Sequence, residues 1–366
     1  MTKTSTPAPT STPTSTPAPG ETTGDFDTGS LAALLRDRGL IGRGPLEVTR
    51  LTGGQSNPTY RLTAGSRRYV LRKKPPGQLL KSAHAIDREY RVIAALRGTD
   101  VPVPAAHFYE EDASIVGTPF YVMDFLDGRV LMDQSLPGLA REDRAPIYRE
   151  MNRVIAALHS IDHEAVGLGD YGRVGNYFAR QIDRWGRQVR DYREGEERID
   201  ALDALAGWLP EHVPPGDATR LVHGDYRLDN LVFHPIEPRA IGLLDWELST
   251  LGHPLADFSY NCLGWHIPAE LWRGIGGLDL AALGIPDERT YVGWYARESS
   301  GGPIDHWDFY LAYNLFRLAA IMQGIARRAR DGNAAAADAI ETGKKARPLA
   351  ELGWQYALRH DAASSA

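Results

Sequence analysis

The residues best suited to chemistry lie in two neighbouring segments in the second half of the chain. The segment 221–233 sets His223, Asp225 and Asn230 between two short apolar runs, and Asp245 follows the next apolar run. A positioned carboxylate can accept the proton of an attacking hydroxyl. An amide oxygen and a second carboxylate suit a hard cation that prefers oxygen ligands. These are the groups that transfer of a phosphoryl group from a nucleotide to a hydroxyl requires.

The spacing within the first segment matches the pattern H-x-D-x-x-x-x-N. In the protein-kinase form of this pattern the Asp orients the acceptor hydroxyl, the Asn holds a metal ion, and a later Asp holds metal between the phosphates. Gly224 stands where that form has Arg. The pattern predicts Asp225 as the catalytic residue and Asn230 and Asp245 as metal ligands. A turn followed by a surface carboxylate is the alternative that any motif match leaves open.

A basic and an acidic residue upstream could hold the phosphates of a nucleotide. A predicted strand ends in the basic run Arg72, Lys73 and Lys74, and apolar residues recur at helical spacing over 84–96. Strand alternation puts Arg72 and Lys74 on one face and Lys73 on the other. In kinases a strand cation pairs with a helix Glu and bridges the phosphates. We therefore predict that Arg72 pairs with Glu89, with Lys74 as the second choice; a solvated strand end is the alternative.

Two further segments are expected to contact the nucleotide. Gly53, Gly54 and Ser56 lie in a predicted turn between strands, where small residues let backbone N–H groups approach phosphate oxygens. A simple hairpin turn is the alternative there. The apolar run 119–128 predicts a hinge between two lobes, at which backbone groups of Asp124 and Leu126 would bond to the adenine.

Taken together, these motifs resemble the aminoglycoside phosphotransferase family, small-molecule kinases with a protein-kinase-like fold. The similarity runs from about residue 46 to about residue 352. The motifs that carry it are Tyr69-Val-Leu-Arg72, Arg88-Glu-Tyr90, Tyr121-Val-Met-Asp-Phe125, His223-Gly-Asp225, Asn230 and Asp245-Trp-Glu247. More narrowly, the runs 71–77, 82–84 and 244–257 resemble the branch found as the kinase-like N-terminal domain of some acyl-CoA dehydrogenase-family proteins.

The resemblance implies roles for three supporting residues. It gives Arg72 the role of the phosphate-bridging cation, although the family usually has Lys there. Arg contacts two oxygens through a planar fork, whereas Lys acts as a point charge. Asp257, on a helix that starts near residue 254, is expected to brace the catalytic loop from beneath, with His223 as structural support.

The implied fold class is α+β, with a small N-lobe of antiparallel sheet plus a helix and a larger, mainly helical C-lobe. We assign residues 1–24, rich in Thr, Ser, Pro and Ala, to a disordered tail. Residues 25–124 would form the nucleotide-binding N-lobe. Residues 125–360 would form the C-lobe with the catalytic loop, metal site and acceptor pocket, and 361–366 a frayed tail.

The composition indicates which partners and which cellular compartment to expect. The chain has 366 residues, of which 43% are hydrophobic, enough for large cores. A net charge of −6 argues against a nucleic-acid partner, and the absence of a long apolar run argues against a membrane span. The single cysteine, Cys262, suits a reducing compartment, so a cytoplasmic location is expected.

The acceptor is the least specified part of the prediction. A helix over 310–330 carries Arg317 among apolar neighbours and Arg327 near its end. Arginines would hold a carboxylate or a CoA phosphate and would repel a cationic aminoglycoside. A solvated last turn that complements the helix dipole is the alternative for Arg327.

The sequence therefore predicts an ATP- and Mg²⁺-dependent kinase that phosphorylates the hydroxyl of a small, anionic acceptor, a hydroxyacyl-CoA or a hydroxy acid. Three alternatives stay open: an aminoglycoside O-phosphotransferase, a non-catalytic nucleotide-binding module, and a metal-dependent hydrolase that uses the same acidic cluster. The choice between ATP and GTP and the oligomeric state also stay open.

Overall fold

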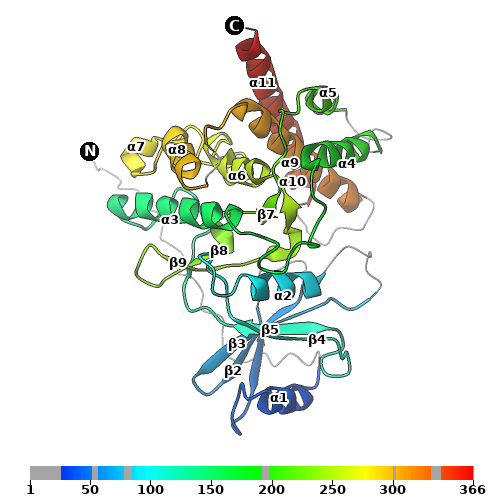
Figure 1. The fold of residues 1–366 in the computed structure, drawn as a ribbon, viewed down its shortest axis with the longest axis vertical. Helices are drawn as coiled ribbons and strands as arrows, with labels where there is room; N and C mark the ends of the chain where they lie inside the picture. Colours follow the sequence, from blue (N-terminus) through cyan, green and yellow to red (C-terminus); the bar gives the residue numbers. More distant parts are fainter. Residues whose placement is uncertain are drawn as a thin grey trace, which may run out of the picture.

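The computed structural model describes residues 26–51, 57–77, 85–191, 198–299, 302–330 and 339–365, and these form two lobes (Figure 1). The small lobe is a five-stranded antiparallel sheet in the order β1-β2-β3-β5-β4, with one helix on each side. Its elements are α1 (Thr28–Asp37), β1 (Glu47–Arg50), β2 (Thr59–Ala64), β3 (Arg67–Lys73), α2 (Ile86–Ala95), β4 (Ala106–Glu110) and β5 (Phe120–Asp124). The predicted α+β, two-lobed architecture is confirmed.

Alternation along β3 decides which basic residue faces α2. Arg72 lies opposite Tyr121 in the β3–β5 register, and Lys73 lies opposite Phe120. Because side chains of directly paired residues share a face, Arg72 and Tyr121 point to the α2 side of the sheet. Lys73 points to the α1 side, where its ammonium donates to the carbonyl of Val116.

The large lobe is mainly helical, with two small sheets at its junction with the small lobe (Figure 1). Its helices are α3 (Arg141–His159), α4 (Tyr177–Asp191), α5 (Asp200–Trp208), α6 (Pro254–Cys262), α7 (Leu280–Leu283), α8 (Glu288–Glu298), α9 (Trp307–Arg330), α10 (Ala339–Lys344) and α11 (Ala346–Ser364). Its strands are β6 (Arg129–Val130), β7 (Arg220–Val222), β8 (Leu231–Phe233), β9 (Ala240–Leu243) and β10 (Thr250–Gly252). Among the described helices, none is long and apolar enough to cross a membrane.

The end of the chain differs from the prediction. Residues 361–366 were expected to fray, but α11 continues through Ser364. The Asp361 carboxylate accepts hydrogen bonds from Nε1 of Trp208 at 3.1 and 3.0 Å, which ties the last turns of α11 to α5. The prediction of a frayed tail is therefore wrong for 361–364, because a long-range contact outweighs the weak local signal.

Helix α2 lies between the sheet and the large lobe and is joined to the latter by a cluster that we call the α2 latch (Figure 1). The latch consists of Arg88, Tyr171 and Ser249. Nη2 of Arg88 donates to the Tyr171 carbonyl at 2.6 Å, and the Tyr171 hydroxyl donates back to the Arg88 carbonyl at 3.1 Å. The Tyr171 hydroxyl also bonds to Oγ of Ser249 at 2.7 Å. The latch fixes α2, and with it Glu89, relative to the large lobe.

Candidate active site

The two oxygens of the Asp225 carboxylate have different surroundings. Oδ1 accepts from the Tyr260 hydroxyl at 2.7 Å and faces Nε of Arg227 at 3.1 Å. Among the described residues, Oδ2 has a single long contact, with Nδ2 of Asn230 at 3.4 Å. The side chain is 20% exposed, so solvent and ligands can reach it. Oδ2 is therefore the oxygen left available to an incoming hydroxyl.

Asn230 and Asp245 form an oxygen-lined position next to this carboxylate. Nδ2 of Asn230 donates to the Asp225 carbonyl at 2.8 Å, which leaves its amide oxygen available to a cation. The Asn230 carbonyl accepts from the N–H of Leu244, so Asp245 follows directly beside it. Asp245 has φ 66° and ψ 59°, a left-handed conformation that is uncommon outside glycine and is found at functional sites.

This donor set fits Mg²⁺. Mg²⁺ takes oxygen ligands and commonly uses one or two protein groups, with phosphates and waters completing its shell. The amide oxygen of Asn230 and the Asp245 carboxylate, whose side chain is 36% exposed, would supply such a pair. Within the described ranges no group of three or more His, Cys, Asp or Glu is arranged to hold a metal by itself. The site is thus suited to a cation brought with a nucleotide.

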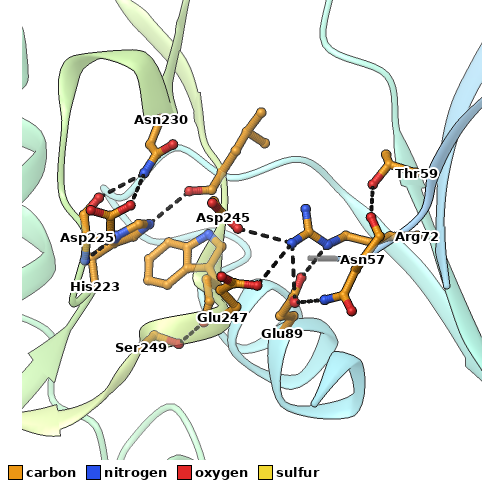
Figure 2. Close-up of polar contacts among 12 residues, drawn as sticks. Asn57, Thr59, Arg72, Glu89, His223, Asp225, Asn230, Asp245, Glu247 and Ser249 are labelled. Carbon is orange, nitrogen blue, oxygen red and sulfur yellow. Dashed lines mark hydrogen bonds and ion pairs between the residues drawn. The ribbon is translucent and has the colours of Figure 1, made fainter. Parts of the chain in front are cut away.

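Arg72 links the two lobes through acidic partners on both sides (Figure 2). Its Nε lies 2.8 Å from Oε2 of Glu89, and its Nη2 lies 3.0 Å from Oδ1 of Asp245 and 3.8 Å from Oε2 of Glu247. Burial alone would lower the pKa of the guanidinium, but the surrounding carboxylates raise it above its ordinary value. The geometry favours Arg72 over Lys74 as the cation that pairs with Glu89, since β3 ends at Lys73.

Glu89 is almost fully buried and receives three donors. Besides Arg72, Nδ2 of Asn57 donates to it at 2.8 Å and the Tyr121 hydroxyl at 3.1 Å. Burial raises the pKa of Glu89 to about 7, with nearby Asp245 adding to the effect and Arg72 opposing it. The carboxylate therefore gains its proton within reach of neutral pH.

This titration predicts a pH dependence of nucleotide use. Above about pH 7 ionised Glu89 holds Arg72, and below it the protonated acid loses the charge that orients the guanidinium. We expect kcat/KM for ATP to fall by up to about tenfold per unit as the pH drops below 7. Glu89→Gln should have a kcat/KM about 10–100-fold lower and lack this acidic limb. A limb of unchanged position in Glu89→Gln would assign it to another group.

The raised pKa of Glu89 also affects stability, in the direction opposite to its effect on activity. Between its ordinary value of 4.5 and about 7, folded Glu89 binds a proton that the unfolded chain has released. The contribution of this group to the free energy of unfolding therefore decreases as the pH rises through that window. Activity and stability consequently respond to Glu89 in opposite directions.

Asp257 supports the catalytic loop from below. Its carboxylate accepts from the backbone N–H groups of His223 at 2.7 Å and Gly224 at 2.9 Å, and from Nε2 of His159 at 3.3 Å. Burial alone would raise the pKa of Asp257, but these hydrogen bonds, above all that of His159, lower it. Gly224 has φ +83°, and a Cβ there would lie 2.5 Å from the Leu248 carbonyl oxygen, so the turn requires glycine.

His223 connects the loop to the segment that carries Asp245. Its Nε2 donates to the Leu244 carbonyl at 2.8 Å, and its Nδ1 accepts from the N–H of Asp225 at 3.3 Å. The imidazole thus points away from the reacting groups and fixes the spacing between the two segments.

The position of Arg317 changes its interpretation. Nη2 of Arg317 donates to the Gly224 carbonyl at 2.7 Å, and its guanidinium lies over the Tyr260 ring, 5.0 Å from the centroid. These contacts show that Arg317 supports the catalytic loop, and its contact with an acceptor stays a prediction. Arg327 lies ten residues further along α9, about 15 Å away along the helix axis, so the two do not form one pocket.

The predicted nucleotide contacts of the small lobe are only partly described. Gly53, Gly54 and Ser56 lie outside the described residues. At the hinge, the N–H of Asp124 donates to the Ala105 carbonyl at 2.9 Å and is occupied within the sheet. Leu126 lies past the end of β5, against Gly242, and its backbone makes no hydrogen bond to another described residue. Of the two predicted hinge residues, Leu126 has the freer backbone.

Sequence reasoning missed four residues of the site: Asn57 and Tyr121 beside Glu89, and Arg227 and Tyr260 beside Asp225. One local signal points to Tyr260 in retrospect. Tyr260 follows Asp257 by three residues, which places both on one helix face. Tyr121 is the cross-strand partner of Arg72, a register that no local pattern supplies.

The two-lobed fold, with a loop Asp, an Asn and a second Asp at the lobe junction, defines a kinase-like phosphotransferase. The chain belongs to the phosphotransferase enzyme family, whose family model matches residues 47–294.

Individual relatives differ in length and identity. The chain is 45% identical to mouse acyl-CoA dehydrogenase family member 10 over 328 residues, which cover 88% of this chain and 30% of that protein. It spans less than half the length of the curated relatives it matches. A Ralstonia eutropha structure described as a candidate aminoglycoside phosphotransferase is 52% identical, with a TM-score of 0.84, covering 91% of this chain and 99% of that one.

A more distant structure shows the fold alone. Aminoglycoside phosphotransferase APH(4)-Ia, solved with AMP-PNP and hygromycin B, aligns with a TM-score of 0.59 at 15% identity, covering 89% of this chain and 97% of that one.

Proposed function

We propose that this protein transfers the γ-phosphoryl group of ATP to the hydroxyl of a small anionic acceptor, a hydroxyacyl-CoA or a hydroxy acid. Residues 25–124 would bind the nucleotide, and 125–360 would carry the catalytic loop and acceptor pocket. The observation that carries the proposal is the assembled junction in which Arg72 contacts Glu89 of the small lobe and Asp245 of the large lobe.

In the proposed reaction the acceptor oxygen attacks the γ-phosphorus, and the bond from that phosphorus to the oxygen bridging the β-phosphate breaks, which releases ADP. Oδ2 of Asp225 orients the hydroxyl and takes its proton late in the transfer. Tyr260 and Arg227 hold Oδ1, so the carboxylate keeps one orientation while the acceptor binds. Positioned groups of this kind cost little reorganisation during the reaction.

The phosphates are expected to meet fixed positive charge. Asn230 and Asp245 would hold Mg²⁺, which when bound neutralises charge on the β- and γ-phosphates. Arg72, oriented by Glu89, would contact the phosphates with its planar fork. Preorganised electrostatics of this kind supplies most of the catalysis in phosphoryl transfer.

Two relatives bear on the acceptor. The mouse protein is named an acyl-CoA dehydrogenase family member, which favours an acceptor of the acyl-CoA type. The Ralstonia protein is described as a candidate aminoglycoside phosphotransferase, which keeps an aminoglycoside as the second candidate. Arg227 and Arg273 are each paired with a carboxylate, Asp225 and Asp229, so the local charge is balanced, and the preference for an anionic acceptor rests on the acyl-CoA dehydrogenase relatives.

The test is ADP release that depends on both Mg²⁺ and ATP, measured with a 4-hydroxyacyl-CoA and with kanamycin. Release with the CoA ester, together with a product heavier by one phosphoryl group, would support the proposal. Release with kanamycin alone would show that the acceptor is an aminoglycoside and not an anionic compound. Failure with both, while ATP still binds, would favour a nucleotide-binding module.

Loss of the Tyr260 hydroxyl tests the orientation of Asp225. We expect Tyr260→Phe to lower kcat about 10–100-fold, the value of one hydrogen bond to a charged group, and to leave KM for ATP unchanged. Tyr69→Phe is the matched control, since among the described residues its hydroxyl bonds only to the Leu40 carbonyl of the small lobe. Equal kcat values for both variants would remove Tyr260 from the mechanism.

A further inference from the structure

The large lobe contains a cavity of about 260 Å³ that lies apart from the candidate active site. Its walls come from the end of α3, the loop before β7, the start of α6 and the segment between α8 and α9 (Figure 1). Asp225, Asn230 and Asp245 are not among its lining residues. One water occupies about 30 Å³ in the liquid, so the cavity has room for a small organic molecule.

Two opposite charges line this cavity without neutralising each other. Arg220 and Asp217 are both exposed, and neither forms an ion pair with a described residue. Nη1 of Arg220 donates to the Thr219 carbonyl at 2.9 Å, and Oδ2 of Asp217 accepts from the N–H of Asn176 at 2.6 Å. The positive and the negative group are therefore both available to a ligand.

His253 adds a neutral donor to the lining. Its Nδ1 caps α6 by accepting from the N–H of Leu255 at 3.2 Å, so the proton of the neutral imidazole lies on Nε2. Burial lowers the pKa of His253 to about 4, although the charge of Asp217 opposes this effect. Nε2 makes no hydrogen bond to another described residue. It can donate to a carboxylate at the N-terminus of α6, where the helix dipole also favours negative charge.

The rest of the lining includes an apolar wall, by which we mean Leu255, Ile304 and Tyr310. The Tyr310 ring stacks on the His253 imidazole, with centroids 5.9 Å apart and planes inclined by 22°. A ligand that fits this lining carries a carboxylate, an ammonium group and an apolar side chain. In an α-amino acid the two charged groups are bound to one carbon atom, so one end of a small cavity can contact both.

The inner wall of the cavity is connected to the catalytic loop. His159 and Tyr295 line the cavity and are each 2% exposed. The Tyr295 hydroxyl donates to Nδ1 of His159 at 2.6 Å, and Nε2 of His159 donates to Asp257. Asp257 in turn accepts from the N–H groups of His223 and Gly224. A ligand packed against Tyr295 therefore restrains the contacts that hold the loop.

We propose that this cavity binds an α-amino acid with an apolar side chain, and that the bound amino acid slows the opening of the catalytic loop. Arg220 and Nε2 of His253 receive the carboxylate, Asp217 receives the ammonium group, and the apolar wall receives the side chain. This site is separate from those proposed for the nucleotide and the acceptor.

Calorimetric titration of leucine, phenylalanine, 4-methylpentanoate and 3-methylbutylamine tests the binding. The last two are leucine without its ammonium group and leucine without its carboxylate. We expect the tighter of the two amino acids to lose about 10–100-fold in affinity in Arg220→Gln and in Asp217→Asn. The control Arg239→Gln removes an exposed arginine that pairs with Glu237, and it should leave the affinity unchanged.

Three results would overturn the amino-acid site. The first is the absence of binding by both leucine and phenylalanine. The second is equal affinity for leucine and 4-methylpentanoate, which would give the ammonium group, and with it Asp217, no part in binding. The third is unchanged affinity in Arg220→Gln, which would place the amino acid elsewhere on the protein.

Hydrogen exchange tests the connection to the catalytic loop without ATP or an acceptor, so its outcome does not depend on the proposed function. The amide protons of His223 and Gly224 exchange when the loop opens away from Asp257. We expect the bound amino acid to slow this exchange about fivefold or more, as for measured couplings between sites.

Tyr295→Phe separates binding from this connection. The substitution keeps the ring that stacks on Phe258, with centroids 3.8 Å apart, and removes the hydroxyl that bonds to His159. We expect the amino acid still to bind this variant but no longer to slow the exchange of His223 and Gly224. Exchange that is slowed equally in wild type and Tyr295→Phe, or in neither, would overturn the proposed effect on the loop.

Discussion

Replacement of Asp225 by Asn is expected to lower kcat by about 10³-fold, within the range that a positioned base contributes. Asparagine keeps the shape of the side chain but cannot take the acceptor proton. Because Asp225 does not contact the Arg72 and Glu89 pair, KM for ATP should change less than about twofold. The measurement is initial-rate ADP release with the best acceptor, alongside calorimetric binding of ATP.

A control variant and a folding measurement make this result interpretable. Asp183→Asn removes an exposed carboxylate on α4 whose partner is Arg187, and it should retain wild-type kinetics. Unchanged circular dichroism of both variants would establish that Asp225→Asn is folded. Turnover by Asp225→Asn at the wild-type rate would show that another group orients the hydroxyl.

Replacement of Asp245 by Asn is expected to lower kcat/KM for ATP by about 10²–10³-fold, the cost of removing one preorganised charge partner. The change removes a proposed Mg²⁺ ligand and an ionic partner of Arg72 at once. We also expect the Mg²⁺ concentration for half-maximal activity to rise, since one of two protein ligands loses its charge. ADP release measured against Mg²⁺ concentration checks both effects.

The neighbouring Glu247 provides the comparison. Its carboxylate lies 3.8 Å from Arg72, further than that of Asp245, so Glu247→Gln should lose less than about tenfold. Equal losses in the two variants, with the same Mg²⁺ response, would contradict the assignment of Asp245 as the metal ligand.

The parts of the site that sequence could predict are those encoded within short segments. His223, Asp225 and Asn230 are neighbours along the chain, and one loop positions all three. Alternation along a single strand was enough to select Arg72 over Lys73. The two-lobed fold followed from the same motifs through resemblance to a family.

The remaining parts depend on contacts between distant segments. Tyr260 reaches Asp225 from α6, a contact that its place one turn after Asp257 indicates only once the packing of α6 against the catalytic loop is known. The contact of Arg317 with the catalytic loop could not be predicted, because its neighbours on α9 show only that it lies among apolar groups, not which surface it meets. Trp208 stabilises the end of α11 from α5, a contact that composition near the terminus cannot reveal.

The α2 latch has a consequence for regulation. With Arg88 bonded to Tyr171, and Tyr171 to Ser249, the helix that carries Glu89 is already in its working position before any ligand arrives. In a two-state enzyme, apparent affinity is reduced by the fraction of molecules that are binding-competent. Because the latch holds α2 in this arrangement, we expect that fraction to be close to one, so an activator would gain little by selecting the competent form. We expect such a kinase to be constitutively active. Its flux would then be set by acceptor supply and protein abundance and not by displacement of α2.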